Sequence, residues 1–342
     1  MQRPCMVVKN RSAEKARKIL LEAGLLDNGY QVRSLDRSVV FPLVDGSYPE
    51  DIPEELSKHE YREMDVEPRK VRPKSFKEML DLPFELSELV PSSYDIIGDI
   101  GIIRLPEELI PHKLEIARAM KDFNRNLKTV CLDKGVKGEF RIRDLEVLEG
   151  LRDLETTHVE NNLRFKLDPS KVYFSPRLAT ERMRIARSIE WEERVLDMFS
   201  GIGPFALNIA MHSPAESVIG IDLNPECIQY FQRNITLNSL DDKVEAYLGD
   251  SSEVASTLIP FDRIVMNLPH SSMDYLSFAL LLLEQGNIHL YRIVEEGGFM
   301  KEVSRIMEIA EYEGKDVKIL GTREVHNYSP SQSMMVFDLR VD

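Results

Sequence analysis

Residues 193–205, ERVLDMFSGIGPF, constrain the fold of this chain of 342 residues more than any other stretch. An apolar, strand-like run over 195–199 ends in the glycine turn 200–203, and a helical pattern follows at once. Glycine lets a backbone approach a ligand closely, because no Cβ stands in the way. The helix directs its free N–H groups toward the same place. This order indicates a nucleotide-binding α/β unit, although α/β proteins that bind no ligand also show it.

Further strand-like segments follow, separated by helical patterns, and predict a parallel, doubly wound sheet. They span residues 218–221, 244–248, 261–266 and 288–294. In such a sheet the ligand lies beyond the carboxyl ends of the strands, so Asp222, Asp250 and Asn267 should face one crevice. An acid after the second strand suits a ribose diol, and an acid after the third suits the exocyclic amine of an adenine. Taken singly, each acid could instead cap a helix or end a strand.

The net charge of −14 is unevenly distributed. Residues 1–75 carry +1, residues 76–143 carry −1, and residues 144–342 carry −14. Within the middle part, residues 121–143 hold seven basic side chains against three acidic ones. Such a segment is a candidate phosphate track, or else an ordinary solvated surface. Charge alone therefore does not identify a nucleic-acid-binding protein.

Cysteine usage and hydropathy indicate a soluble protein of a reducing compartment. Cys5, Cys131 and Cys227 are too widely spaced for a disulfide framework or a zinc site, so we expect no metal. The longest apolar run, residues 278–283, is far too short to span a membrane, and the N-terminus lacks a signal-peptide pattern. We expect a cytoplasmic protein without membrane contact, and nothing demands more than a monomer.

The segments before the sheet predict two small α+β domains. We expect a first domain over 1–65, a linker over 66–90, a second domain over 91–169 and the sheet domain over 170–342. The other expected strands lie at 6–8, 30–33, 39–43, 96–104, 129–132, 140–142, 158–161, 163–167, 315–320 and 334–340, and the expected helices lie at 13–23, 107–124, 225–238 and 273–285. Asn224 is the expected N-cap of the helix at 225–238.

The glycine turn with its following acids resembles the class I S-adenosylmethionine (SAM) methyltransferases. A dinucleotide dehydrogenase fits less well, because Pro204 stands where G-x-G-x-x-G needs conformational freedom. The resemblance implies a Rossmann-like, seven-stranded sheet with an antiparallel last strand, and SAM as the cofactor. It also implies the cofactor-binding residues Asp197, Phe199, Gly201, Gly203, Pro204, Phe205, Asp222, Leu223, Asp250 and Asn267.

Four motifs narrow this resemblance. They are Y-F-S-P-R-L-A-T-E-R at 173–182, F-R-I-R-D-L-E at 140–146, N-L-P at 267–269 and G-D-I-G at 98–101. Together they resemble the archaeal and eukaryotic tRNA (guanine-N1)-methyltransferase family, whose members modify guanosine 37, just 3′ of the anticodon. The resemblance covers essentially the whole chain. It implies tRNA as the partner, with the middle domain on the anticodon stem-loop and the N-terminal domain on the elbow.

The chemistry of guanine N1 explains the residues that match. N1 carries a proton at neutral pH, so methylation needs a base there and stabilisation of the negative charge that moves onto O6. The resemblance assigns these roles to Glu181 and Arg141, and places Asn267 at the guanine edge as a third catalytic residue. The substrate-binding residues that we expect are Tyr173, Pro269, Arg143, Lys134 and Lys137. With Ser175 as N-cap and Pro176 at the first helical position, Glu181 should lie about two turns into a helix.

Other interpretations stay open. Without the family, Glu181 would form a surface ion pair with Arg177 or Arg184. Arg141 would make a phosphate contact or a surface pair with Asp144. Aminocarboxypropyl transferases of the wybutosine pathway share this fold and act at the same tRNA position, and methylation of a tricyclic guanosine derivative is a related alternative. A non-catalytic RNA-binding protein is a further alternative. Leu268 and His270 depart from the Asn-Pro-Pro-Tyr motif, which disfavours protein methylation.

Overall fold

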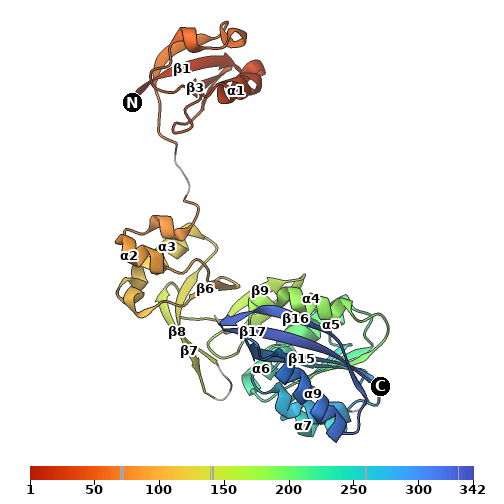
Figure 1. Cartoon of the computed structure of the whole chain (residues 1–342). Coiled ribbons are helices and arrows are strands. Elements are labelled where there is room, and N and C mark those ends of the chain that lie inside the picture. The colour runs from red at the N-terminus through yellow and green to blue at the C-terminus, as the bar shows by residue number, and fades with distance from the viewer. Residues whose placement is uncertain (70–72, 139, 141, 259, 330) are drawn as a thin grey trace. The chain divides into compact units, whose positions relative to one another are not determined.

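The computed structural model describes residues 1–69, 73–138, 140, 142–258, 260–329 and 331–342 (Figure 1). The chain divides into two compact units, Met1–Lys74 and Ser75–Asp342. Within the second unit, an α+β module precedes a large α/β domain in sequence.

The N-terminal unit is a four-stranded antiparallel sheet covered by one helix. Its elements are β1 (Gln2–Lys9), α1 (Ala13–Glu22), β2 (Arg33–Leu35), β3 (Ser38–Pro42) and β4 (Glu60–Asp65), in the order β2-β3-β1-β4. Leu20 of α1 packs on Met6, Val8 and Phe41 of the sheet. β4 is not among the predicted strands, because its residues EYREMD alternate only weakly between exposed and partly buried positions. The strand expected at 30–33 begins only at Arg33.

The middle module combines a four-stranded sheet with two helices. Its elements are α2 (Phe84–Leu89), β5 (Asp95–Ile97), β6 (Ile100–Ile103), α3 (Lys113–Phe123), β7 (Thr129–Lys137) and β8 (Ile142–Glu149), with sheet order β5-β6-β7-β8. Part of the segment predicted as a linker, 66–90, belongs to this module. Phe76 and Val90 are buried in its core with Leu109 and Met120, and Phe76 contacts the ring of Tyr94 edge-on. Burial of these apolar side chains orders the segment despite its prolines and charged residues.

The third part is a seven-stranded sheet in the order β13-β12-β11-β14-β15-β17-β16. The strands are β11 (Arg194–Asp197), β12 (Ser217–Asp222), β13 (Val244–Leu248), β14 (Arg263–Met266), β15 (Gly286–Glu295), β16 (Val317–Ser329) and β17 (Gln332–Val341). The strands from β13 to β15 are parallel, and β17 runs antiparallel to both β15 and β16. The predicted fold class, including the antiparallel last strand, is therefore confirmed.

Helices cover both faces of this sheet (Figure 1). One face carries α4 (Ala179–Arg187), α5 (Pro204–His212) and α6 (Pro225–Leu237), and the other carries α7 (Ser251–Val254), α8 (Leu276–Leu281) and α9 (Phe299–Tyr312). The helix expected at 273–285 is a 3₁₀ turn, Ser272–Tyr275, followed by the short α8. Asn224 caps α6 as predicted, because its side chain accepts from the N–H of Glu226.

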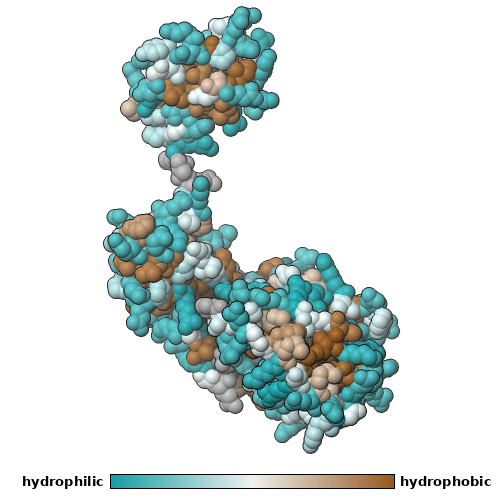
Figure 2. All heavy atoms as spheres, in the orientation of Figure 1, coloured by the Kyte–Doolittle hydropathy of each residue, from teal (hydrophilic) through white to brown (hydrophobic). Residues whose placement is uncertain are grey.

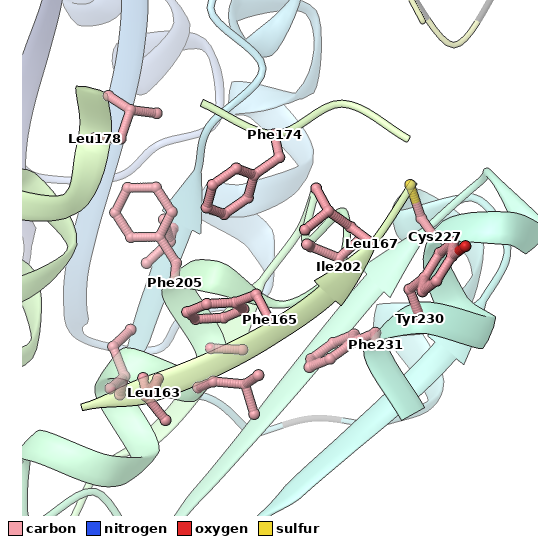
Figure 3. Close-up of a cluster of buried hydrophobic side chains, with 14 of the residues drawn as sticks. Leu163, Phe165, Leu167, Phe174, Leu178, Ile202, Phe205, Cys227, Tyr230 and Phe231 are labelled. Carbon is pink, nitrogen blue, oxygen red and sulfur yellow. The ribbon is translucent and has the colours of Figure 1, made fainter. Parts of the chain in front are cut away.

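A hairpin of β9 (Thr156–Glu160) and β10 (Leu163–Leu167) packs on the α/β domain. Figure 3 shows its side chains Phe165 and Leu167 in one cluster with Phe205 and Phe231. The backbone of β10 at Lys166 exchanges hydrogen bonds with the side chain of Asn234 on α6. The hydrophobic core of the α/β domain therefore includes this hairpin, which the sequence analysis had placed before the boundary at 169.

The surface on the face in Figure 2 is largely hydrophilic, with hydrophobic residues in separate patches. Among the described residues, no helix combines the length and hydropathy needed to cross a membrane.

Candidate active site

The glycine turn after β11 lies at the carboxyl edge of the sheet. Gly201 and Gly203 have left-handed φ angles of 54° and 87°, which favour glycine. A Cβ on Gly201 would meet no atom closer than the carbonyl oxygen of Tyr173 at 3.9 Å. A Cβ on Gly203 would lie 2.1 Å from the ring of Phe231. Helix–sheet packing therefore explains Gly203, whereas Gly201 leaves the open space that the sequence analysis ascribed to both glycines.

The two acids after β12 and β13 both have local hydrogen-bond partners. Asp222 accepts from the N–H of Gly201 at 2.8 Å and from that of Asn224 at 2.9 Å. Asp250 is the N-cap of α7 and accepts from the N–H of Ser252 at 2.8 Å. A carboxylate has about four lone-pair sites, so each acid can still accept from a ligand. Helix capping and ligand binding are therefore compatible here.

Buried polar atoms without partners gather at the same edge. Both carboxylate oxygens of Asp197, the hydroxyls of Ser200 and Ser251 and the amide oxygen of Asn267 make no hydrogen bond with any described residue. Native proteins almost always pair buried polar groups, so these atoms indicate a polar ligand that completes the site. The hydroxyls, amines and charged groups of SAM would supply such partners, so these residues fit that cofactor.

Burial dominates the electrostatics of Asp197. Burial and, to a smaller extent, the neighbouring Asp222 raise the pKa of this carboxyl, which lies at about 7. The amides of Phe199 and Ala206 lower the pKa in part, but neither makes a full hydrogen bond with the carboxylate. A cation in this site would favour the ionised form of Asp197.

Of the other residues predicted to bind the cofactor, some have exposed side chains and others have buried ones. Leu223 is 48% exposed beside Asp222, and the ring of Phe199 contacts Tyr275 edge-on at 5.0 Å. Pro204 begins α5, and Phe205 is buried in the hydrophobic core against Tyr291. Leu223 thus offers an exposed apolar surface, whereas the Phe205 side chain is occupied by packing.

Glu181 lies in the first turn of α4, which corrects the predicted helix start. Residues Pro176–Leu178 form a separate 3₁₀ turn, and the Ser175 side chain makes no capping hydrogen bond. The carbonyl of Ser175 instead accepts from Arg182 at 3.0 Å, and this contact holds the turn against α4. The helix therefore begins later than the Ser-Pro signal indicates.

Glu181 is buried and paired. Its side chain is only 3% exposed, and it accepts from Arg184 at 2.7 Å and from the Tyr291 hydroxyl at 2.8 Å. The expected alternative, an i,i+3 ion pair with Arg184, is thus present, but it is not on the surface. Tyr291 is not among the predicted site residues, because a tyrosine in an apolar strand gives no signal beyond that of a core residue.

Strand register places Glu181 near the predicted guanine-binding loop. Met266, which precedes Asn267, pairs with Leu290, and Tyr291 follows Leu290 directly. The hydrogen bond to Tyr291 therefore holds Glu181 at the carboxyl end of β14. The carbonyl of Pro269 accepts from the N–H of Ile293 at 3.1 Å, so β15 also supports the N-L-P loop.

The predicted tRNA-binding side chains lie on or beside β7 and β8. Lys134 and Lys137 both pair with Asp144, at 3.7 and 2.9 Å, and Lys137 is largely exposed. Arg143 is only 11% exposed and donates to Asp95 at 2.8 Å. The prediction for Arg141 lies outside the described residues.

Asp95 links two parts of the site that the sequence analysis treated separately. It accepts from Arg143 on β8 and, at 2.9 Å, from Arg177 in the 3₁₀ turn before α4. The middle module and the segment that leads to Glu181 are therefore joined through one carboxylate. A lone aspartate at the start of a short strand gave no sequence signal for this link.

No cluster of His, Cys, Asp or Glu that could hold a metal ion occurs in the part of the chain that the structure describes.

The chain is similar to known proteins along nearly its whole length. Residues 156–320 match the TRM5/TYW2 methyltransferase domain, residues 76–153 the TYW2 N-terminal domain, and residues 5–51 the tRNA methyltransferase 5 N-terminal domain. The tRNA (guanine(37)-N(1))-methyltransferase Trm5b of Pyrococcus abyssi is 40% identical over 97% of both chains.

The chain belongs to the TRM5 family. The family resemblance predicted from the sequence motifs is thereby confirmed. A second TRM5 enzyme, from Methanocaldococcus jannaschii, is 32% identical over 99% of this chain and 98% of its own.

Solved TRM5 structures share the whole architecture. The crystal structure of Pyrococcus abyssi Trm5b has a TM-score of 0.83 and 38% identity, and covers 99% of both chains. The complex of aTrm5 with tRNALeu has a TM-score of 0.84 at 30% identity, also over 99% of both chains. The tRNA(Phe) (4-demethylwyosine(37)-C(7)) aminocarboxypropyltransferase of Pyrococcus horikoshii is 35% identical but matches only 76% of this chain.

Proposed function

We infer that this chain is a SAM-dependent tRNA methyltransferase that transfers a methyl group to N1 of guanosine 37. The observation that carries this function is the end-to-end similarity to enzymes named for that reaction, at 40% and 32% identity. The unpaired buried atoms around Asp197 and Asn267 support a polar cofactor at the carboxyl edge of the sheet.

The cofactor would be held by residues from several strand ends. The free lone pairs of Asp222 suit the ribose hydroxyls, and those of Asp250 suit the adenine amine. The exposed side chain of Leu223 suits a face of the adenine ring. The ionised carboxylate of Asp197 suits the cationic methionine end, because opposite charges favour each other strongly in a buried site. When bound, SAM supplies the methyl group.

The chain's own residues would manage the proton and the charge on the guanine. Glu181 takes the proton from N1, which leaves a lone pair for the new N–C bond. Negative charge then moves onto O6, where the guanidinium of Arg141 stabilises it. Asn267 and the N-L-P loop around Pro269 hold the guanine edge, and Tyr173, half-exposed beside Gly201, packs against the base or the methionine end.

Recognition of tRNA falls to the smaller domains. Lys134 and Lys137 on β7 would contact the phosphates of the anticodon stem, with Arg143 on the neighbouring strand β8 as a further contact. The target guanine must leave its stack to reach the site. The N-terminal domain, which matches the tRNA methyltransferase 5 N-terminal domain, would contact the tRNA elbow. All three cysteines are free and buried, and we propose that the protein acts as a monomer in the cytoplasm.

Aminocarboxypropyl transfer is the second candidate, because the relative from Pyrococcus horikoshii is 35% identical over 76% of this chain. The full-length TRM5 matches, including residues 5–51, favour methyl transfer. The test is incubation of the protein with methyl-labelled SAM and tRNA transcripts that carry guanosine or adenosine at position 37. We expect a gain of one methyl mass on the guanosine transcript alone. Equal labelling of both transcripts, or addition of a carboxylate-bearing group, would overturn the proposal.

A further inference from the structure

A chain of buried and partly buried polar and charged groups runs beneath α4 toward Glu181. At its far end, Arg263 donates to both oxygens of Glu193, at 2.6 and 3.0 Å. The same guanidinium lies 2.6 Å from Nε2 of His289, and Nδ1 of His289 lies 2.6 Å from Asp338. All four side chains are buried or nearly so. The reaction proposed above assigns no role to any of them.

These contacts fix the protonation state of His289. A guanidinium can only donate, so Nε2 of His289 must accept from Arg263 and the ring proton must lie on Nδ1. That proton is donated to Asp338. Burial lowers the pKa of His289, which agrees with a neutral ring. Burial alone would raise the pKa of Asp338, but hydrogen bonds from His289 and Arg184 hold it at about 2.

Arg184 joins this chain to the base. Its guanidinium donates to Asp338 at 2.8 Å and to Glu181 at 2.7 Å, so two carboxylates share one cation. Burial disfavours the charge on Arg184, but its bonds to both carboxylates raise its pKa overall. Burial and the charge of Glu181 raise the pKa of Tyr291, so its hydroxyl keeps its proton and donates to Glu181.

The two oxygens of Glu181 are unequally occupied. Oε1 accepts from Tyr291 at 2.8 Å and from Arg184 at 2.7 and 3.1 Å. Oε2 accepts one bond from Arg184 at 2.9 Å, and Arg323 on β16 lies 3.7 Å away, beyond hydrogen-bond distance. Oε2 therefore keeps lone pairs that Oε1 has already used.

We propose that Tyr291, Arg184 and Asp338 position Glu181, so that Oε2 is the oxygen that removes the N1 proton of guanine. This inference rests on the proposed function. Tyr291 and Arg184 donate hydrogen bonds to this buried carboxylate and thereby fix its orientation. Hydrogen bonds of this kind favour the charged form of a carboxyl group. Asp338 draws part of the Arg184 charge away from Glu181, which preserves the basicity of that carboxylate. The groups that face Glu181 are thus Arg184 on α4, Tyr291 on β15, Arg323 on β16 and, through Arg184, Asp338 on β17.

The first test is Tyr291→Phe, which removes one hydroxyl and keeps the ring. The readout is the single-turnover methylation rate at saturating SAM and tRNA across pH 5.5–8.5. Loss of a hydrogen bond to the charged form should move the acidic limb of this profile up by about one pH unit. Binding of tRNA and SAM should stay within about twofold of wild type, because the hydroxyl faces Glu181. Tyr230→Phe is the matched control, since that buried tyrosine also bonds a carboxylate, Glu155, at 3.2 Å.

The second test is Asp338→Asn, which should move the profile in the opposite direction. Without the charge of Asp338, Arg184 pairs with Glu181 alone and stabilises its carboxylate more strongly. The acidic limb should therefore move down, and the plateau rate should fall about tenfold because Glu181 becomes a weaker base. A purely structural role would not produce opposite displacements in the two variants.

The result that overturns the inference is an unshifted acidic limb in both variants, whatever their thermal stability. If Tyr291→Phe does not fold, Asp338→Asn decides alone: an unchanged limb contradicts the inference and a downward shift supports it. Failure of the proposed function is separable, because Glu181→Gln would then keep wild-type turnover or the product would not be N1-methylguanosine.

Discussion

Binding of SAM should depend on pH through Asp197. The carboxyl has a pKa of about 7 in the free protein, and only its ionised form attracts the cationic methionine end of the cofactor. If binding requires the ionised form, the apparent Kd scales with one plus the ratio of protonated to ionised carboxyl. From pH 8 to pH 6 this factor rises from about 1.1 to about 11, so we expect affinity to fall about tenfold. Isothermal titration with SAM at pH 6, 7 and 8, without tRNA, measures this change.

The raised pKa of Asp197 also predicts how the folding stability depends on pH. Its folded pKa lies above its unfolded value of about 3.9, so folding favours the protonated form. Stability is then lost as pH rises from the unfolded pKa to the folded pKa of Asp197. The loss is complete above about pH 7 and amounts to about 4 kcal/mol, as an upper limit for one buried group. Asp197→Asn should therefore raise the free energy of unfolding at pH 8 while it weakens SAM binding.

Calorimetry on Asp197→Asn provides the control for both expectations. The variant should melt at a higher temperature than wild type at pH 8, and its SAM affinity should no longer change between pH 6 and 8. The reasoning fails if wild-type affinity is the same at pH 6 and pH 8. It also fails if the variant keeps the full pH dependence, because another group would then be responsible.

Three further outcomes are expected. Glu181→Gln should bind SAM as wild type does but lose roughly 10²–10⁴-fold in single-turnover rate, and near-normal turnover would remove the base mechanism. Gly203→Ala should destabilise the protein strongly in thermal melts, since its Cβ would lie 2.1 Å from Phe231 at a φ of 87°. Gly314→Ala, left-handed but open, should cost only about 1 kcal/mol by comparison. The double substitution Lys134→Ala, Lys137→Ala should weaken tRNA binding and lower the slope of log affinity against log salt by about two, and an unchanged slope would exclude both contacts.

The sequence predicted the α/β domain well because its signals are local. β13 spans Val244–Leu248 as expected, and Asn224 caps α6 as its chemistry predicts. A short, mostly apolar segment between polar ends, and an Asn-Pro pair before a helical pattern, need no tertiary information to be recognised. The same holds for the glycine turn, although the reason for Gly203 emerged only from the packing of Phe231.

The features that sequence missed depend on contacts between distant segments. β4 is too polar to be recognised as a strand and forms because β1 offers a free edge. Ser175 and Pro176 satisfy the rule for a helix start, yet the bond from Arg182 leaves a 3₁₀ turn there. Two of the side chains that face Glu181, Tyr291 and Arg323, come from strands more than 100 residues away, and no periodicity of the sequence indicates such a pairing.

The shared carboxylate of Asp95 has a consequence for how the enzyme responds to RNA. Asp95 accepts hydrogen bonds from Arg143 of the middle module and from Arg177, which lies just before the helix that bears Glu181. A displacement of β8 on RNA binding would therefore reach that helix through these two ionic contacts. A free guanine nucleotide is too small to contact β8, so we expect that it does not displace this strand. Only a large, folded RNA would then move Glu181 fully into its catalytic position.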